Sequence, residues 1–501
     1  MRIDLALGEQ RFSVDVRVPD EQIAVAQAKY TPATQTWEEV VEEGLRHPIG
    51  TPSLRSHNLR GKKIALITDD WGRPTPSHRV LPAVLRELHA AGAVAEDITI
   101  LTGTGVHLPM NQEDLIRKVG QAQFDKYRCV PHDAFDDANM TYVGLSPRGT
   151  PLWLNTIVAE ADFKVVVGRI APHNTHGYEG GAKMITPAVS RWLSVLRNHS
   201  CNFSPYCEYG SYGINPSRAD VDDIGEMVNL EFIVNFVVNR FGEPLRAFCG
   251  HRILAHRAGI AYGDREVWGA EIGRKADLTI ATLGANLARG AHAPSPLEQA
   301  AIGTRARWEA AHSGDVTGMG GVAPVPIIGT GGSKGSPNGH SGALGLAGNP
   351  GTLIFVGHPA GPESVPSAWE HEKSSWSFDQ IFVEHERRDQ QRSPREISDR
   401  CKSIRGEYYA RRAGYLCDVV FAINRPSETV IRKNEARFEE SLQKAVDAAL
   451  DRLGKDARVL VLPEAANTLP MPQFHAFPEL EALLPDGDVA ARLGGMAVAA
   501  G

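Results

Sequence analysis

Two histidines, three glycines and one lysine follow a strongly apolar stretch in the middle of the chain. Residues 163–167 are rich in β-branched side chains, which predicts a buried strand. The loop after them reads PHNTHGYEGGAKM and contains His173 and Lys183. An imidazole can transfer protons near neutral pH, and a lysine beside a glycine-rich loop can contact phosphate or act as a nucleophile. The loop therefore presents polar chemistry from a rigid strand.

The glycines of this loop, Gly177, Gly180 and Gly181, have two interpretations. Glycine permits positive φ and close approach of the backbone to a ligand, as in anion-binding loops, but an ordinary turn needs the same freedom. The spacing in GYEGGAKM does not fit a Walker phosphate-binding motif. A single histidine at a strand end is, in the same way, often a hydrogen-bonded structural residue.

A helix is predicted to begin at Pro187, because proline suits the first helical position. The sequence AVSRWLSVLRN then gives this helix an apolar face. The face consists of Val189, Trp192, Leu193 and Leu196. The helix leads to His199, so His173, Lys183 and His199 fall within one strand, loop and helix.

Alternating strands and helices precede this region. Strands are predicted over residues 62–68 and 97–102, and helices over residues 78–91 and 112–119. This alternation is typical of an α/β fold. In such folds the functional loops lie at the carboxyl ends of the strands, and here those ends carry TDDWGRPTP and GTGVH.

These two loops contain Asp70, Arg73 and His107. The planar guanidinium of Arg73 can bind phosphate or carboxylate, whereas the alternative is an Asp70–Arg73 ion pair that fixes the turn. His107 can act as a general base. Because it follows a strand end as His173 does, we predict two bases that face one cavity. Proton acceptors on both faces of a carbon centre would suit a racemase.

The chain has 501 residues, which predicts two or three domains. Its 42% hydrophobic and 23% charged residues are typical of a globular protein with a large core. The net charge of −7 and the lack of a broad basic stretch argue against nucleic acid or an acidic membrane as a partner. A small-molecule partner is expected, and the oligomeric state stays open between a monomer and a homo-oligomer.

The N-terminal sequence MRIDLALGEQRFSVDV alternates apolar and polar residues, unlike a secretory signal, and predicts a β-hairpin. No stretch approaches the roughly 18 uninterrupted apolar residues of a membrane-spanning helix. The six cysteines contain no CxxC pair and predict reduced structural thiols. A cytoplasmic protein is expected.

A second region of α/β alternation follows residue 270, so two α/β domains are predicted, over residues 1–270 and 271–501. The last residues could pack back on the first domain. The glycine- and serine-rich stretch 329–348 is either a lid over the cleft or a linker. A helix is predicted over residues 435–453 from its apolar spacing. The spaced residues are Phe438, Leu442, Val446 and Leu450.

The motifs TDDWGRPTP, GTGVH, PHNTHGYEGGAKM and NHS follow one another in this order. In these motifs and their spacing the chain resembles the nickel-pincer lactate racemases and their 2-hydroxy-acid racemase and epimerase relatives. The resemblance is specific over residues 62–200. A weaker likeness continues through DLTIATLG, TLIFVGH and ANTLP.

The resemblance implies a nickel-pincer nucleotide, the nickel complex of pyridinium-3,5-bisthiocarboxylic acid mononucleotide. It implies attachment of this cofactor to Lys183 through a thioamide, with His199 as a nickel ligand. His107 and His173 match the two catalytic bases. The further residues expected to bind the cofactor are Asp70, Arg73, Gly180 and Gly181, and Arg73 is also expected to bind substrate. In the implied reaction, hydride leaves C2 of a 2-hydroxy acid and returns to its opposite face. The domain of residues 1–270 would bind the cofactor, and that of residues 271–501 would close the substrate cleft.

One downstream segment departs from the lactate enzymes. Where they carry an aromatic residue, a glutamine and, three residues later, a lysine, this chain reads SPLEQAAIG. Glu298 then replaces the aromatic residue, Gln299 remains, and Ile302 replaces the lysine. We expect Glu298 and Gln299 to contact substrate, and an added carboxylate would suit hydroxyl groups better than a small anion. Misalignment of a variable segment is the alternative.

The function predicted from the sequence is inversion of C2 in a 2-hydroxy acid larger than lactate, such as an aldonate. The alternatives are a lactate racemase proper, a non-catalytic protein that binds the pincer nucleotide, and an unrelated enzyme with a Schiff-base lysine.

Overall fold

The computed structural model describes residues 1–204, 206–284, 296–304, 351–356 and 417–483, without residues 427 and 466. It describes residues 393–399 and 413 in part. The glycine-rich stretch predicted as a lid or linker, residues 329–348, lies outside the described residues.

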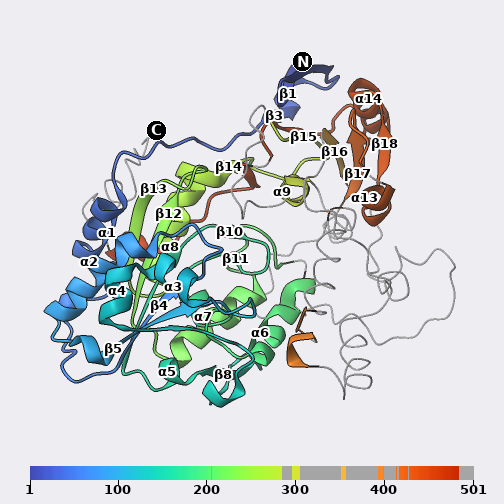
Figure 1. The fold of residues 1–501 in the computed structure, drawn as a ribbon. Helices are drawn as coiled ribbons and strands as arrows, with labels where there is room; N and C mark the ends of the chain where they lie inside the picture. The colour runs from blue at the N-terminus through green and yellow to red at the C-terminus, as the bar shows by residue number, and fades with distance from the viewer. Residues whose placement is uncertain are drawn as a thin grey trace. The chain divides into compact units, whose positions relative to one another are not determined.

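The chain divides into two compact units, which Figure 1 draws from the N-terminus in blue to the C-terminus in red. The large unit contains Lys29–Gly269 and the described segment that begins at Phe474. The small unit contains Met1–Ala28 and the described residues between Ala270 and Gln473. The first 28 residues thus group with later parts of the chain, whereas the sequence analysis placed them with residues 29–270.

A six-stranded sheet forms the centre of the large unit. Its strands, in spatial order, are β13 (Pro244–Gly250), β12 (Phe232–Val238), β9 (Phe163–Arg169), β4 (Ile64–Asp69), β5 (Ile98–Gly103) and β6 (Arg128–Pro131). All neighbouring strands run parallel except β13, which is antiparallel to β12. The sheet is therefore of the α/β kind, and its parallel strands end on a common edge.

Both faces of this sheet are covered, which explains why β4 is buried along its whole length. Ile64 and Leu66 pack in a core cluster with side chains of α1 (Trp37–Arg46), α2 (Ser77–Ala90) and α3 (Gln112–Val119). Ala65 and Ile67 point to the opposite face, because side chains alternate along a strand. There they share a cluster with α7 (Pro216–Met227), α8 (Leu254–Gly263) and the segment around Lys183.

The elements predicted before residue 120 are confirmed. The predicted strands correspond to β4 and β5, and the predicted helices to α2 and α3. Helix α3 begins at an asparagine cap, since the side chain of Asn111 accepts the Asp114 N–H at 2.9 Å. Strand β9 contains the predicted residues 163–167 and continues to Arg169.

The helix predicted from Pro187 begins later, and that prediction is wrong in its start. Helix α6 spans Trp192–His199. The residues before it use their backbone elsewhere, because the carbonyl of Ala188 accepts from Gly105 and that of Val189 accepts from Asn155. A chain bonded to two neighbouring segments in this way cannot continue a helix. The helix still ends at His199, as predicted.

The small unit is built on a second six-stranded parallel sheet. Its order is β18 (Arg437–Glu439), β17 (Asp418–Ala422), β16 (Thr352–Val356), β15 (Leu278–Thr282), β19 (Val459–Leu462) and β3 (Ile23–Val25). The predicted N-terminal hairpin is confirmed as β1 (Arg2–Leu7) and β2 (Gln10–Asp15). Because β3 pairs with β19, the N-terminal residues complete this sheet. Two α/β units are thus present, and the predicted fold class is confirmed.

The helix predicted over residues 435–453 is correct only in its second part. Helix α14 spans Leu442–Leu453, and Ser441 caps it by accepting the Lys444 N–H at 3.3 Å. Phe438 lies instead on β18, which pairs with β17. The apolar spacing from Phe438 to Leu442 fits a helix, but the cap and the strand pairing separate the two residues.

The remaining elements are short. They are α4 (Gln121–Lys126), β7 (Met140–Leu145), β8 (Pro151–Asn155), α5 (Thr156–Ala159), β10 (Pro172–His173), β11 (Gly177–Tyr178), β14 (Gly269–Glu271), α9 (Pro296–Ile302), α13 (Glu428–Lys433), β20 (Leu469–Met471) and α15 (Pro478–Leu483).

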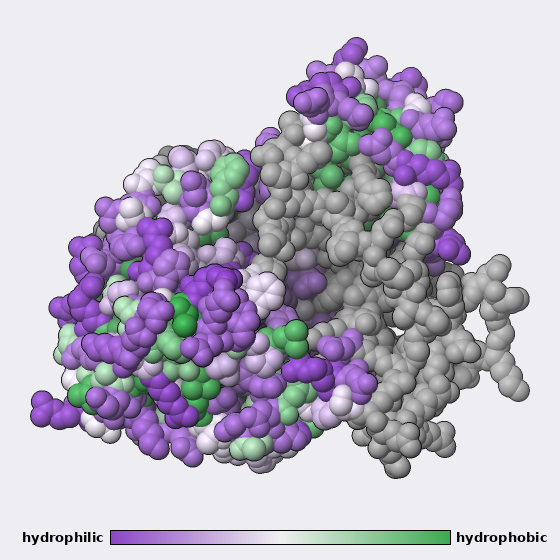
Figure 2. Space-filling model, viewed as in Figure 1, coloured by the Kyte–Doolittle hydropathy of each residue, from purple (hydrophilic) through white to green (hydrophobic). Residues whose placement is uncertain are grey.

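The visible surface of the large unit is mainly hydrophilic, with hydrophobic residues in small separate areas (Figure 2). A search of the described helices finds none that is long and apolar enough to cross a membrane. The five described cysteines, at positions 129, 201, 207, 249 and 417, are free thiols.

Candidate active site

The loop after β9 follows a tightly fixed path to Lys183. It forms the short antiparallel pair β10–β11 and then a 3₁₀ turn, Gly181–Met184. Gly180 and Gly181 have φ of +85° and +60°. A Cβ at Gly180 would lie 2.8 Å from the Arg169 carbonyl oxygen. Both glycines are therefore required by packing within the protein, and their predicted contact with a cofactor stays a prediction.

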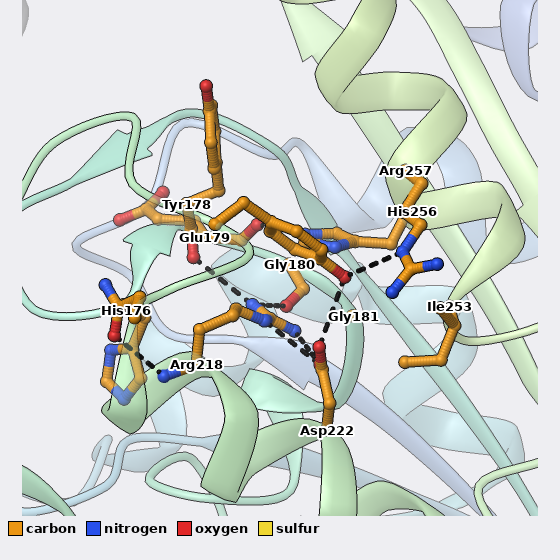
Figure 3. A network of polar contacts seen from close by, with 12 residues as sticks. His176, Tyr178, Glu179, Gly180, Gly181, Arg218, Asp222, Ile253, His256 and Arg257 are labelled. Atoms are coloured by element: carbon orange, nitrogen blue, oxygen red, sulfur yellow. Dashed lines mark hydrogen bonds and ion pairs between the residues drawn. The ribbon is translucent and has the colours of Figure 1, made fainter. Parts of the chain in front are cut away.

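Arg218, on α7, holds the backbone of this loop from below (Figure 3). Its Nη1 donates to the carbonyl oxygens of Tyr178 at 3.3 Å and Gly180 at 3.2 Å. Its Nη2 lies 2.6 Å from Oδ1 of Asp222, one turn later on the helix. Because Arg218 is buried and its charge is paired, it fixes the loop without being available to a ligand.

His256, on α8, holds the same loop from another side (Figure 3). Its Nε2 lies 2.7 Å from the carbonyl oxygen of Glu179. A carbonyl only accepts, so Nε2 carries the proton. Burial lowers the pKa of His256 to about 3, and the ring is neutral at ordinary pH.

Glu179 is a buried carboxylate between two arginines. Arg73 Nη1 lies 2.6 Å from its Oε1, and Arg169 Nε lies 2.6 Å from its Oε2. Burial acts to raise the pKa of Glu179, but the charges of Arg169 and Arg73 hold it well below its usual range. The ion-pair partner of Arg73 is thus Glu179, and the predicted alternative of an Asp70–Arg73 ion pair is wrong.

Lys183 is buried, with 8% of its surface exposed. Burial lowers the pKa of its amine to about 7; Glu179 opposes this shift, whereas Arg73 and Arg218 add to it. A large part of the amine is therefore unprotonated at neutral pH. An unprotonated lysine amine is a nucleophile, which is the property that covalent attachment of a group requires.

Asp70 and His107 form a close pair at the ends of β4 and β5. His107 Nδ1 lies 2.7 Å from Oδ2 of Asp70. Burial acts to raise the pKa of Asp70, but the hydrogen bond from His107 and the charges of His107 and Arg73 lower it overall. The side chain of His107 is 56% exposed, so the ring can be reached from outside. An ionised carboxylate behind an accessible imidazole is a typical general-base arrangement.

His173 has a different environment. Its Nδ1 accepts hydrogen bonds from the backbone N–H groups of Thr175, at 3.1 Å, and His176, at 3.3 Å. Burial, and next the charge of Lys183, hold the pKa of His173 well below its usual range. His107 and His173, predicted as two bases that face one cavity, thus differ in their partners and in their burial.

His176 and His199 complete the polar cluster. The ring of His176 lies 5.3 Å from that of His173 and 5.2 Å from that of His199, centroid to centroid. Its Nε2 donates to Oδ1 of Asn198 at 2.9 Å, since the amide nitrogen of Asn198 donates to Asp220. Its Nδ1 is buried and has no hydrogen-bond partner among the described residues. A buried acceptor of this kind is available to a donor from a bound group.

The structure brings most of the predicted site residues into one neighbourhood of the large unit. Asp70, Arg73, His107, His173, Lys183 and His199 are connected by the contacts above and by their electrostatic effects on one another. Gln299 is buried on α9 of the small unit, and the side chain of Glu298 lies outside the described residues. Their predicted contact with substrate stays a prediction.

Several residues of the site are not among those predicted from the sequence. Glu179 lies inside the quoted motif, and as the single acid of GYEGGAKM it could have been recognised as the partner of a nearby cation. His176 was also present in the motif as its second histidine. Arg218 and His256 could not have been found, because only the fold brings them to the loop, whereas Arg169 stands directly before the loop in the sequence. Among the described residues, no three acidic, histidine or cysteine side chains are arranged to hold a metal ion.

Comparisons with known proteins find similarity over the N-terminal region. Residues 7–210 match the family described as lactate racemase N-terminal domain. A lactate racemase from Thermoanaerobacterium thermosaccharolyticum is 32% identical over 265 residues, which are 52% of this chain and 62% of that protein. A lactate racemase from Lactiplantibacillus plantarum is 31% identical over 263 residues, 51% of this chain and 62% of that protein. The resemblance to lactate racemases is confirmed, and the matched part spans less than two thirds of either relative.

The fold likeness extends further along the chain. The structure of the lactate racemase apoprotein from Thermoanaerobacterium thermosaccharolyticum matches with a TM-score of 0.60 at 22% identity. The match covers 94% of this chain and 100% of that one. The two proteins therefore share their fold.

Proposed function

We propose that this protein is a racemase or epimerase that inverts C2 of a 2-hydroxy acid. The observation that carries the proposal is the charge of Arg73, which acts on Asp70, the partner of His107, and also on His173 and the buried amine of Lys183. The names of the relatives support the same reaction type.

The residues of the loop fit the proposed cofactor, a nickel-pincer nucleotide. The amine of Lys183 is buried and has a pKa of about 7, as covalent attachment requires. His199 would ligate nickel, since imidazole is a suitable donor for that metal, and His176 offers a buried acceptor beside it. When bound, the group would supply the acceptor and donor of the C2 hydride.

The side chains of the protein then bind substrate and move one proton. Asp70 orients the ring of His107 and stabilises its charged form, so that His107 can remove the substrate hydroxyl proton. The side chain of Arg73 is 22% exposed, and its Nη1 lies 2.6 Å from Oε1 of Glu179. We assign its other N–H donors to the substrate carboxylate.

The substrate is proposed to be larger than lactate, such as an aldonate. The support for this is the departure at SPLEQAAIG, where Glu298 and Ile302 replace an aromatic residue and a lysine. A carboxylate accepts hydrogen bonds from sugar hydroxyl groups, whereas the loss of a cation weakens binding of a small anion. Lactate itself is the alternative, and the names of the relatives favour it.

The test uses protein made in cells that synthesise the pincer nucleotide. Each C2 epimer of lactate and of several aldonates is incubated with the protein, and products are separated by chiral chromatography. We expect interconversion, with a deuterium label at C2 retained in the product because the hydride returns to the same carbon. A protein loaded at Lys183 that interconverts no 2-hydroxy acid would contradict the proposal.

The lowered pKa of Lys183 also favours a second candidate, an enzyme that forms a Schiff base with a carbonyl substrate. Borohydride would then trap substrate on Lys183, and activity would not depend on nickel. Intact mass and nickel content distinguish the two, because the first candidate requires an adduct on Lys183 before substrate is added.

A further inference from the structure

His176 lies in the connection between β10 and β11, and its side chain is fully buried. The centroid of its ring lies 5.3 Å from that of His173 and 5.2 Å from that of His199. Burial, and next the charge of Lys183, hold the pKa of His176 well below its usual range, so the ring is neutral. A neutral imidazole has one nitrogen that donates and one that accepts, and the neighbours of the ring decide which is which.

Asn198, on α6, places the proton of His176 on Nε2. The amide nitrogen of Asn198 donates to Oδ2 of Asp220 at 2.7 Å and to the carbonyl oxygen of Ser217 at 3.4 Å. Because a carbonyl can only accept, this side of the amide is the nitrogen, and the amide oxygen faces His176. Nε2 of His176 lies 2.9 Å from that oxygen and therefore donates to it. Nδ1 of His176 then has a lone pair.

Asp220, on α7, keeps the Asn198 amide from turning over. It is buried and accepts hydrogen bonds from Ser146 Oγ at 2.6 Å and from Thr150 Oγ1 at 2.8 Å. Rotation of the amide would place the oxygen of Asn198 against an oxygen of Asp220, and both are acceptors. The hydrogen bonds from Asp220 through Asn198 thus fix the tautomer of His176.

Nδ1 of His176 has no hydrogen-bond donor within the part of the chain that the structure describes. Buried acceptors in folded proteins are nearly always hydrogen-bonded, and here an ordered water or a donor of a bound group can satisfy the atom. The loop therefore presents a fixed acceptor that it does not itself satisfy.

The depth of His176 favours a group that stays bound. The side chains of His107 and Arg73 are 56% and 22% exposed, so a substrate that enters and leaves at each turnover can reach them. His176 is 0% exposed and Lys183 8%, and the charge of Lys183 acts on His176. Attachment through a thioamide, as the resemblance implies, would leave an N–H on Lys183 that can only donate.

We propose that Nδ1 of His176 accepts a hydrogen bond from an N–H or O–H donor of the group carried on Lys183. This role rests on the proposed cofactor, whereas the tautomer rests on the geometry of the chain alone. His176 is then a cofactor-binding residue, separate from His199, the expected nickel ligand, and from His173, the expected base. Substrate and water are the other sources of a donor, and the test distinguishes them.

NMR of the chain labelled with ¹⁵N-histidine tests the tautomer and the donor. The resonances of His176 are those missing from the spectra of His176→Asn and His176→Gln. In the unloaded chain we expect a proton on Nε2 and none on Nδ1. In protein from cells that synthesise the pincer nucleotide, we expect the Nδ1 resonance to move as it does when an acceptor gains a hydrogen bond, before any hydroxy acid is added.

Three NMR results would overturn the proposal. The first is a proton on Nδ1 in the unloaded chain. The second is an Nδ1 resonance that loading leaves in place, as expected if water satisfies the atom. The third is an Nδ1 resonance that moves only when lactate or gluconate is added, because the donor would then belong to substrate.

Two substitutions separate the roles of the ring nitrogens. Asparagine can place an oxygen near the position of Nδ1, and glutamine can place its amide near the position of Nε2. His176→Asn therefore keeps the acceptor and loses the bond to Asn198, whereas His176→Gln keeps that bond and loses the acceptor. Both variants retain the backbone N–H of residue 176, which donates to Nδ1 of His173.

The loaded variants are compared by their rate of nickel loss to excess EDTA. We expect His176→Gln to lose nickel about 3- to 10-fold faster than wild type, as for one lost hydrogen bond, and His176→Asn to stay within about twofold. A role only through Asn198 predicts the reverse order, and equal or reversed rates would overturn the proposal. His47→Asn and His47→Gln, at an exposed position after α1, are the matched controls.

Failure of the proposed function gives a different result. If the wild-type chain gains neither mass at Lys183 nor nickel, in cells where a lactate racemase is loaded, there is no cofactor for His176 to bind and both proposals fail. If the wild-type chain is loaded and its Nδ1 resonance does not move, only the role of His176 fails. The NMR comparison uses loaded wild-type protein, so it decides the question even if a substitution prevents loading.

Discussion

The environment of Lys183 disfavours the charged form of its amine, because the side chain is buried and lies near arginines. At pH 6 an amine with a pKa of about 7 is charged in both the folded and the unfolded chain. Burial of this charge raises the free energy of the folded state and so lowers its stability. This cost is fully present below the folded pKa and disappears as the pH rises towards the unfolded lysine pKa of about 10.4. The residue that the proposed cofactor requires thus destabilises the unloaded protein.

Replacing Lys183 by methionine is therefore expected to stabilise the unloaded chain. We expect the free energy of unfolding to rise by about 1–2 kcal/mol at pH 6, and the gain to shrink as the pH approaches 10. Glu179 keeps both of its arginines at 2.6 Å, so loss of the amine leaves its charge paired. Urea denaturation measures the effect, with the exposed Lys62→Met as control. A loss of stability at pH 6 would contradict the lowered pKa.

Asp70 is expected to matter through its charge rather than its size. Asparagine can accept the same hydrogen bond from His107 but cannot stabilise an imidazolium. We expect Asp70→Asn to lower turnover of the loaded protein by about 10²- to 10³-fold, within the about 10²- to 10⁴-fold that general-base catalysis contributes. Exposed Asp125→Asn on α4 serves as the control. Wild-type turnover in Asp70→Asn would remove Asp70 from the proposed mechanism.

At the scale of elements, a glycine can be required by its positive φ or by the lack of space for a side chain. Gly177 in the loop and Gly61 before β4 allow the two requirements to be compared. Gly177 and Gly61 have nearly the same φ, +70° and +69°. A Cβ at Gly177 would lie 1.6 Å from the carbonyl oxygen of Ser211, whereas a Cβ at Gly61 would meet nothing within 4 Å. A side chain at Gly61 would therefore cause backbone strain alone, whereas one at Gly177 would also collide with Ser211.

Alanine at these two glycines should consequently have very different effects. Gly61→Ala is expected to cost about 1 kcal/mol of unfolding free energy, from the left-handed conformation alone. Gly177→Ala is expected to cost at least about 3 kcal/mol, because β11 must move away from Ser211. Chemical denaturation compares the pair. Equal costs would mean that the loop moves freely, and that its fixed path does not position Lys183.

Elements set by local pattern could be predicted from the sequence. The strands and helices up to residue 120 follow from apolar periodicity and caps, and so does the end of α6 at His199. The start of α6 could not be predicted, because the residues before it bond to Asn155 and Gly105, which lie 34 and 83 positions before Val189 and Ala188. The residues of the site likewise fall into those that the sequence predicts and those that only the fold reveals. Its histidines and lysine stand in visible motifs, whereas the pairing of Glu179 with Arg73, 106 positions earlier, depends on the fold.

At the scale of the molecule, the large unit is completed by a segment from the far end of the chain. His475 Nδ1 lies 2.7 Å from Oδ2 of Asp264, a fully buried carboxylate on the segment after α8. Oδ1 of the same carboxylate accepts from the hydroxyl of Tyr178 and from Trp268 Nε1, both at 2.7 Å. Tyr178 immediately precedes Glu179, so the late segment supports the loop that carries Lys183.

Removal of the His475 side chain should weaken this support. We expect His475→Ala to lower the free energy of unfolding of the large unit by about 1–3 kcal/mol, because a buried carboxylate loses a charged or donating partner. Calorimetry should assign the loss to one transition if the two units unfold separately. Phe477 stacks on His475, and a Phe477→Leu control retains the ion pair. No change in His475→Ala would mean that the late segment is dispensable.

The hydrogen bonds from Tyr178 and His475 to Asp264 also determine when, during synthesis of the chain, the loop can be completed. The segment around His475 must be made before Asp264 acquires this partner and the loop around Lys183 is fully braced. Any enzyme that recognises the finished shape of this loop in order to attach a group to Lys183 would therefore act only after the segment around His475 has been made. Chains truncated before His475 would lack this support, and we expect such an enzyme not to modify them at Lys183.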